Sequence, residues 1–251
     1  MTQARTNFPP ELLSPAGSPE ALAAAIEGGA DAVYFGSVKF SARMRAKNFD
    51  ENEIADAIAL CRAYGVRSYI TVNTLVTDRE LLKAKALIEK LTVLGADALI
   101  VQDMALRAMN LPVEMHASTQ ASNTTAEGAK FLEECGFSRV ILERALTLED
   151  IKKIRQATNV ELECFIHGAI CVGWSGRCFL SRTTSQRSGN RGECSQPCRL
   201  TYDLVTERGE RLISGKHLLS VKDFDLSERI GDLIDAGVMS FKIEGRLKDD
   251  N

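Results

Sequence analysis

The sequence has 251 residues, of which 45% are hydrophobic and 26% charged, and its formal net charge is −3. A chain of this composition can bury a large core, and its charge excludes a surface coated for nucleic acid, so any RNA contact must be local. No stretch is typical of a signal peptide or a membrane span, and we therefore expect a cytoplasmic protein with no membrane partner.

A pattern of helix, glycine and short apolar run recurs along the chain. Each glycine suits the left-handed end of a helix, and each apolar run after it is typical of a buried parallel strand. Helix starts alternate with these runs, at Ser18-Pro19 and at capping boxes beginning at Asp50, Thr77 and Thr147. The predicted strands are residues 11–14, 32–36, 67–73, 98–103, 113–118, 139–144, 160–167 and 239–245.

Eight strands alternating with helices predict an α/β fold, a TIM-type (β/α)8 barrel, as a single domain over residues 1–251. An open doubly wound sheet is the alternative, but such sheets usually carry a glycine-rich phosphate turn after their first strand, and Ser14–Gly17 is not one. Residues 171–215 form a cysteine-rich insertion between strands 7 and 8 that includes a predicted hairpin of 202–205 and 211–214. The closing eighth helix is absent, and we expect the chain to be the N-terminal part of a longer protein.

The insertion holds four of the seven cysteines, Cys171, Cys178, Cys194 and Cys198. The polar stretch 181–193 cannot be ordered by apolar burial, whereas four thiolates on one metal centre would order it. Structural zinc sites usually pair cysteines as C-x(2–4)-C, and the first pair here is C-x6-C, a spacing that iron–sulfur clusters tolerate. The spacing therefore favours an iron–sulfur cluster, with zinc and unliganded thiols as alternatives. The remaining Cys61, Cys135 and Cys164 are typical of helix ends and buried strands.

Five arginines and a single acid, Glu193, lie between residues 177 and 199. The arginines can offset the negative charge of a thiolate-bound cluster, or they can pair with the carboxylate or phosphate of an anionic substrate. We predict that Arg187 and Arg191 bind substrate.

Functional residues of a TIM barrel gather where its strands end. The predicted strands end in polar residues, and from them we predict Arg144 and Glu244 as catalytic. His116 and His167 are also placed at this face, His116 to carry a proton and His167 to act in catalysis or to orient the Cys171 loop. Each polar residue taken singly could instead only bond a loop. The predicted substrate-binding residues at the strand ends are Asn73, Gln102, Ser118 and Arg246.

The segment Glu163–Cys171, with Cys178 and Ser181, resembles the signature of the collagenase-like peptidase family of unassigned mechanism, the U-32 group. The opening Glu11–Gly17, the stretches Gly29–Tyr34 and Phe40–Arg43, and the closing Phe241–Arg246 also resemble that family, and the resemblance covers essentially the whole chain. It implies an oxygen-independent hydroxylase of 23S rRNA, tRNA or ubiquinone precursors, with a 4Fe-4S cluster on the four cysteines of the insertion. For the RNA-modifying relatives it implies prephenate as the donor of the hydroxyl group.

Residues 192–199 and 216–220 are most similar to the 23S rRNA hydroxylase branch of that family. One departure concerns strand 6, after which the family commonly carries Arg-Glu, whereas this chain has Arg144-Ala145 preceded by Glu143.

Two other functions remain as alternatives. A peptidase needs an activated nucleophile or a metal-bound water, and the sequence has neither G-x-S-x-G nor H-E-x-x-H. A Cys171–His167 pair is conceivable but leaves three clustered cysteines unexplained. A non-catalytic iron–sulfur scaffold leaves the polar strand ends unexplained. We therefore expect an RNA hydroxylase that binds RNA, a 4Fe-4S cluster and a prephenate-like dianion.

Overall fold

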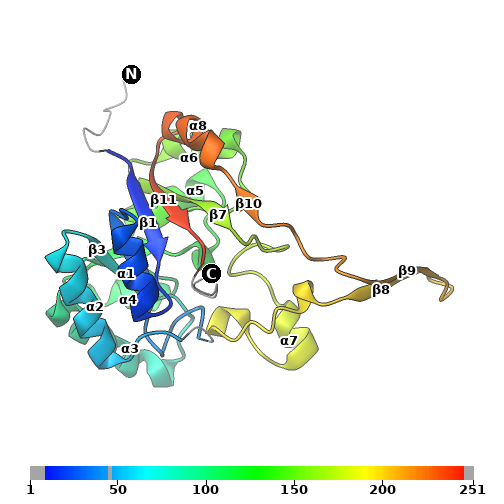
Figure 1. The fold of residues 1–251 in the computed structure, drawn as a ribbon, viewed down its shortest axis with the longest axis horizontal. Coiled ribbons are helices and arrows are strands. Elements are labelled where there is room, and N and C mark those ends of the chain that lie inside the picture. Colours follow the sequence, from blue (N-terminus) through cyan, green and yellow to red (C-terminus); the bar gives the residue numbers. More distant parts are fainter. Residues whose placement is uncertain (1–8, 45–46, 246–251) are drawn as a thin grey trace.

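Eight parallel strands close into a barrel in the computed structural model, which describes residues 9–44 and 47–245 (Figure 1). The last strand pairs with both the first and the seventh, which closes the sheet on itself. The TIM-type barrel is thus confirmed, and the open doubly wound alternative is excluded. The barrel strands are β1 Glu11–Pro15, β2 Ala32–Gly36, β3 Arg67–Val72, β4 Ala98–Val101, β5 Glu114–Ala117, β6 Arg139–Ile141, β7 Glu161–Gly168 and β11 Val238–Ile243.

Helices lie outside the barrel and begin where the capping signals predict. The Ser18 side chain accepts a hydrogen bond from the backbone of Ala21, and Asp50 and Glu53 form a capping box. Within residues 9–44 and 47–245, no helix is long and apolar enough to cross a membrane. The outer helices are α1 Pro19–Glu27, α2 Glu51–Ala63, α3 Asp78–Leu94, α4 Met104–Ala108, α5 Ala126–Glu134, α6 Leu148–Ala157 and α8 Ile230–Asp235.

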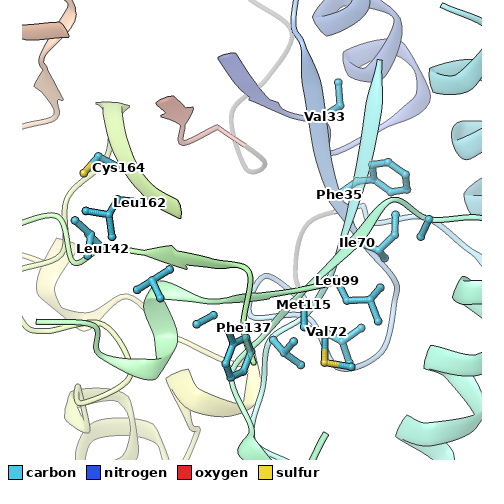
Figure 2. Packing of buried hydrophobic residues seen from close by; sticks show 14 of the residues in the cluster. Val33, Phe35, Ile70, Val72, Leu99, Met115, Phe137, Leu142, Leu162 and Cys164 are labelled. Carbon is cyan, nitrogen blue, oxygen red and sulfur yellow. The ribbon is translucent and has the colours of Figure 1, made fainter. Parts of the chain in front are cut away.

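The main hydrophobic core lies between the strands and these helices. Figure 2 shows outward-facing strand residues such as Phe35, Ile70 and Leu99 in this layer, with Cys164 at one end of it. Burial raises the pKa of Cys164 to about 12 and that of Cys61 to about 11, so both are neutral thiols at physiological pH. Their predicted place in the core is confirmed.

The inside of the barrel combines an apolar layer with a buried ion network. The guanidinium of Arg139, which is 1% exposed, lies 2.6 Å from Glu11 Oε1 and 3.0 Å from Glu163 Oε2. Lys242 Nζ lies 2.9 Å from the other oxygen of Glu163. Although burial alone would raise the pKa of Glu163, Lys242 and Arg139 lower it to about 2. The network therefore holds full charges inside the barrel, and Lys242 connects it to the layer of apolar side chains above, where its Nζ lies 4.1 Å from the ring centroid of Tyr34 and 5.5 Å from that of Phe165.

The chain between β7 and β11 contains the predicted cysteine-rich insertion. It includes α7 Leu180–Ser185 and a hairpin of β8 Tyr202–Val205 and β9 Arg211–Lys216. The hairpin agrees with the predicted one and projects away from the barrel (Figure 1). A short strand, β10 Phe224–Asp225, pairs antiparallel with the end of β7 and returns the chain to the barrel.

Candidate active site at the mouth of the barrel

A pocket opens at the C-terminal end of the barrel. Its walls come from loops and strand ends that are far apart in the sequence, as in other barrels of this type. The lining includes four of the predicted site residues together with others that the sequence did not single out. The polar and charged lining residues are Tyr34, Arg43, Thr71, Asn73, Ser118, Thr119, Gln120, Arg144, Lys242 and Glu244.

Two arginines face one carboxylate in this pocket. Arg144 Nη2 donates to Glu244 Oε2 at 2.6 Å, and Arg43 Nη2 lies 3.6 Å from the same oxygen. The side chain of Arg144 is 2% exposed, and its guanidinium carbon lies 3.9 Å from the ring centroid of Phe165. Lys242, the third cation of the lining, is paired with Glu163, so the two arginines with their single carboxylate leave the pocket one positive charge in excess. Such an excess of positive charge suits an anionic ligand.

Asn73 and Ser118 both line the pocket and hold its rim together. Asn73 Oδ1 accepts a hydrogen bond from the backbone of Ala42 at 2.9 Å, and its amide nitrogen lies 3.3 Å from Ser118 Oγ. Gln102 does not line the pocket; its side chain donates to the carbonyl of Gln120 at 3.0 Å. The prediction that Gln102 contacts substrate is corrected, because its amide supports a pocket wall from behind. Arg246 lies outside the residues that the structure describes.

The two barrel histidines do not line the pocket. His116 is 1% exposed, its Nε2 lies 3.2 Å from Glu114 Oε1, and its ring meets the edge of Tyr69 at 4.8 Å. Its ring thus turns towards the N-terminal end of β5, away from the mouth, and burial lowers its pKa. This corrects the predicted position of His116 at the active face. The side chain of His167 is exposed near the end of β7.

Residues 169–201, which we call the cysteine segment, lie against the loops that form the pocket. The backbone of Ser175 donates to Glu143 Oε2 at 2.9 Å, and the backbone of Leu75 donates to Asn190 at 3.0 Å. Gly176 has φ +75°, and a Cβ there would overlap the carbonyl oxygen of the pocket residue Gln120. The cysteine segment and the pocket therefore share a wall.

The four cysteines of this segment lie near one another. Cys171 and Cys178 are exposed, and Cys194 and Cys198 are half-buried. Burial raises the pKa of Cys198, and negative charge on Cys171, Cys194 and Cys178 would raise it further, so the four sulfurs lie within electrostatic range of one another. Cys194 Sγ also accepts from the backbone of Gln196 at 3.4 Å. Across the described part of the chain, no group of three or more histidine, cysteine, aspartate or glutamate side chains is arranged to hold a metal ion. The donor set nonetheless suits an iron–sulfur cluster, because it consists of four gathered thiols.

Arg191 anchors the cysteine segment to the barrel. Its guanidinium makes a bidentate pair with Glu80 at 2.8 and 2.6 Å and donates to the carbonyl of Leu75 at 2.6 Å. This pairing lowers the pKa of Glu80 to about 2. These contacts use three of its five N–H donors, and Arg191 does not line the pocket, so the structure gives it an anchoring contact while its role in substrate binding stays a prediction. Arg187, the other predicted substrate arginine, is half-buried and does not line the pocket.

Loss of the Arg191–Glu80 pair should loosen the cysteine segment. We expect Arg191→Ala and Glu80→Ala to release iron several-fold faster than the wild type under a chelator, because a hydrogen bond to a charged group contributes about 1.5–3 kcal/mol. The double variant should be little worse than either single variant. Lys85→Ala, which removes an exposed ion pair with Glu89 on the same helix, is the matched control. If Arg191→Ala retained iron like the wild type but bound substrate more weakly, Arg191 would be a substrate-binding residue rather than an anchor.

A comparison with known families assigns the chain. The sequence model described as Peptidase family U32 matches residues 17–251. This chain belongs to the peptidase U32 family. A solved structure of a U32 peptidase has the same fold, with a TM-score of 0.64 at 15% identity, covering 98% of this chain and 96% of that one.

Curated relatives of the U32 chain carry two kinds of name. A 23S rRNA 5-hydroxycytidine synthase of Escherichia coli is 49% identical over 240 residues, and a tRNA hydroxylation protein of Bacillus subtilis is 37% identical over 251 residues. A protein of Porphyromonas gingivalis named collagenase is 35% identical over 254 residues. Each match covers 95% of the U32 chain but only 37%, 59% and 61% of the respective relative.

Sequence reasoning missed two cations of the U32 pocket. Lys242 lies on β11 and Glu244 directly follows that strand, and both side chains line the pocket. Arg43 lies in the loop after β2, and its only signal was its place in the family-like motif from Phe40 to Arg43. Lys242 could have been found from the inward-facing positions of its strand, and Arg43 from the loop motif.

Proposed function

We propose that this U32 chain carries the substrate pocket and the cluster-binding segment of an oxygen-independent RNA hydroxylase. The observation that carries the proposal is the shared wall: a cationic pocket at the barrel mouth adjoins the segment that gathers four cysteines. The names of the relatives in Escherichia coli and Bacillus subtilis support RNA as the substrate class.

The charges of the pocket support a small dianionic donor of the hydroxyl group, such as prephenate. Arg43, Arg144 and Lys242 would face its carboxylates, while Glu244 fixes Arg144 and Arg43 in place. An arginine–carboxylate pair about 4 Å apart contributes about 4 kcal/mol at an effective dielectric near 20, before desolvation is subtracted. We therefore assign Arg144 and Glu244 to binding and orienting the donor.

Cys171, Cys178, Cys194 and Cys198 would hold a 4Fe-4S cluster, with zinc as the alternative. When bound, such a cluster supplies one-electron chemistry or a Lewis-acidic iron. The N–H of Gln196 and the hydroxyl of Ser181 both point to Cys194 Sγ, and donors of this kind stabilise thiolate ligands.

A peptidase is the second candidate, because one relative is named collagenase. It would need a nucleophile hydrogen-bonded to a base. His116 is bonded to Glu114 in the barrel interior, and the pKa values of Cys61 and Cys164 are raised, which removes these residues from such a role. A purely structural cluster scaffold leaves the charged pocket without a purpose.

The test is an anaerobic assay with cluster-loaded protein, prephenate and RNA from a strain that lacks the modification. Nucleoside mass spectrometry should show a hydroxylated base in rRNA or tRNA. Arg144→Gln should lower the rate at least about tenfold with unchanged cluster content, because the donor loses a charged partner. Arg229→Gln, which removes an exposed arginine paired with Asp232, is the control.

Gelatin cleavage by the wild type with no change in any RNA would favour the peptidase. An Arg144→Gln protein with full hydroxylation activity would remove the pocket from the proposal.

A further inference from the structure

Two large aromatic side chains are exposed on the cysteine segment. Among the described residues, four large aromatic side chains are exposed: Tyr64 (68%), Phe131 (55%), Trp174 (46%) and Phe179 (65%). Tyr64 directly follows α2 and Phe131 lies on α5, whereas Trp174 and Phe179 are five residues apart in one segment. Exposed aromatic side chains on one short segment are typical of an interaction site, and here they lie on the segment that adjoins the pocket.

Both aromatic residues lie next to anchored points of that segment. Trp174 precedes Ser175, whose backbone is bonded to Glu143, and Gly176, which packs on the pocket residue Gln120. Phe179 lies two residues before Ser181, whose hydroxyl lies 3.7 Å from Cys194 Sγ. The two rings are therefore carried by backbone fixed between the mouth of the pocket and the cysteines.

Each ring is followed by an arginine three residues later, in a hydrogen-bonded turn. The N–H of Arg177 donates to the carbonyl of Trp174 at 3.1 Å, and that of Arg182 donates to the carbonyl of Phe179 at 2.9 Å. Both arginines are exposed, and within the described ranges neither forms an ion pair with a carboxylate. Glu193 is the only acid in residues 169–201. This surface is therefore locally cationic on a chain whose net charge is −3.

We propose that Trp174 and Phe179 form a stacking platform for unpaired bases of an RNA substrate, with Arg177 and Arg182 contacting the adjoining phosphates. The inference rests on the proposed function and names its RNA-binding residues. Aromatic rings stack on any base whose face is free, and arginines follow the backbone, so alternating rings and cations are typical of single-strand binding. Bases inside a duplex have no free face, and the platform therefore selects loops, bulges or ends.

The experiment measures binding of a short, fluorescently labelled single-stranded RNA of mixed sequence to cluster-loaded protein by anisotropy. Trp174→Ala and Phe179→Ala should each weaken binding roughly tenfold or more, since stacking of one base accounts for a loss of that size. Tyr64→Ala and Phe131→Ala, which remove equally exposed rings elsewhere, should bind like the wild type. Trp174→Phe should restore most of the affinity, because it keeps an aromatic face.

Trp174 is also the only tryptophan of the chain, which gives a direct readout of stacking. Its emission should be quenched when single-stranded RNA is added, and a fully paired RNA duplex of equal length should quench it far less. Circular dichroism and visible absorbance identify any variant that has lost its fold or its cluster. The binding data of such a variant are set aside, and quenching of Trp174 in the wild type then tests whether the ring stacks on RNA.

The outcomes separate this inference from the proposed function. Weaker RNA binding in both ring variants, with controls unchanged, supports the platform even if no hydroxylated base is found. Hydroxylation by the wild type, combined with unchanged RNA affinity in both folded ring variants and no quenching, overturns the platform and leaves the function standing. Equal binding and equal quenching by duplex RNA would also overturn it.

Discussion

Replacing Cys194 with serine should abolish the visible absorbance of anaerobically purified protein, whereas replacing Cys164 should leave it unchanged. The two thiols differ in surroundings. Cys194 is half-buried in the cysteine segment and affects the pKa of Cys198, while Cys164 faces the helix layer with a pKa of about 12. A thiolate ligand must be deprotonated, and burial in the helix layer opposes that at Cys164. Hydroxylation should be lost with the absorbance.

Iron, sulfide and zinc analyses complete the measurement. Serine at Cys171, Cys178 or Cys198 should act like serine at Cys194, and serine at Cys61 should act like serine at Cys164. A colourless protein with one bound zinc would establish the alternative metal. A colourless Cys164→Ser protein beside a coloured Cys194→Ser protein would contradict the assignment altogether.

Replacing Arg139 with methionine should lower the free energy of unfolding by about 3–5 kcal/mol, because it leaves buried carboxylates without their main cationic partner. Arg139 bonds to Glu11 and Glu163, and both carboxylates are nearly fully buried. Arg67→Met is the matched control, since Arg67 is 52% exposed and also pairs with Glu11. That substitution should cost at most about 1 kcal/mol. Urea unfolding of the three proteins measures the difference.

The loss of free energy of unfolding caused by Arg139→Met should become smaller as the pH falls. In the wild type the pKa of Glu163 is lowered to about 2, so its contribution to stability is present above the unfolded pKa of about 4.3 and is lost as pH falls towards 2. Without Arg139 that contribution shrinks, and the gap between the two proteins should narrow as the solution is acidified. The two proteins can be compared at about pH 3 and about pH 7, on either side of the unfolded pKa of glutamate. An equal difference in their free energies of unfolding at both values would mean that packing rather than charge is responsible.

The repeating pattern predicted the strands well because barrel strands are buried on both faces and leave continuous apolar runs. Caps such as Asp50–Glu53 predicted helix starts equally well, since a cap is a local interaction between neighbours in the sequence. The hairpin of residues 202–216 was predictable for the same reason.

The site was predictable only in outline. Strand position indicates which face a side chain occupies but not where its tip points, and His116 therefore turned out to bond Glu114 rather than to face the pocket. The anchoring pair of Arg191 was not predicted, because its partner Glu80 is 111 residues away and no local pattern reveals such a pair. Lys242 was hidden within a strand that reads as ordinary core.

The buried ions at the lower end of the barrel bear on the order of events at its mouth. With Arg139, Glu163 and the apolar layer filling the interior, the pocket has its opening where the cysteine segment lies. An RNA strand resting on Trp174 and Phe179 would cover that opening. The small dianion would then have to enter before the RNA arrives and could leave only after the RNA departs. On the proposed function, such a site would follow a compulsory sequence of substrate addition, in which excess RNA would inhibit by trapping protein that holds no donor.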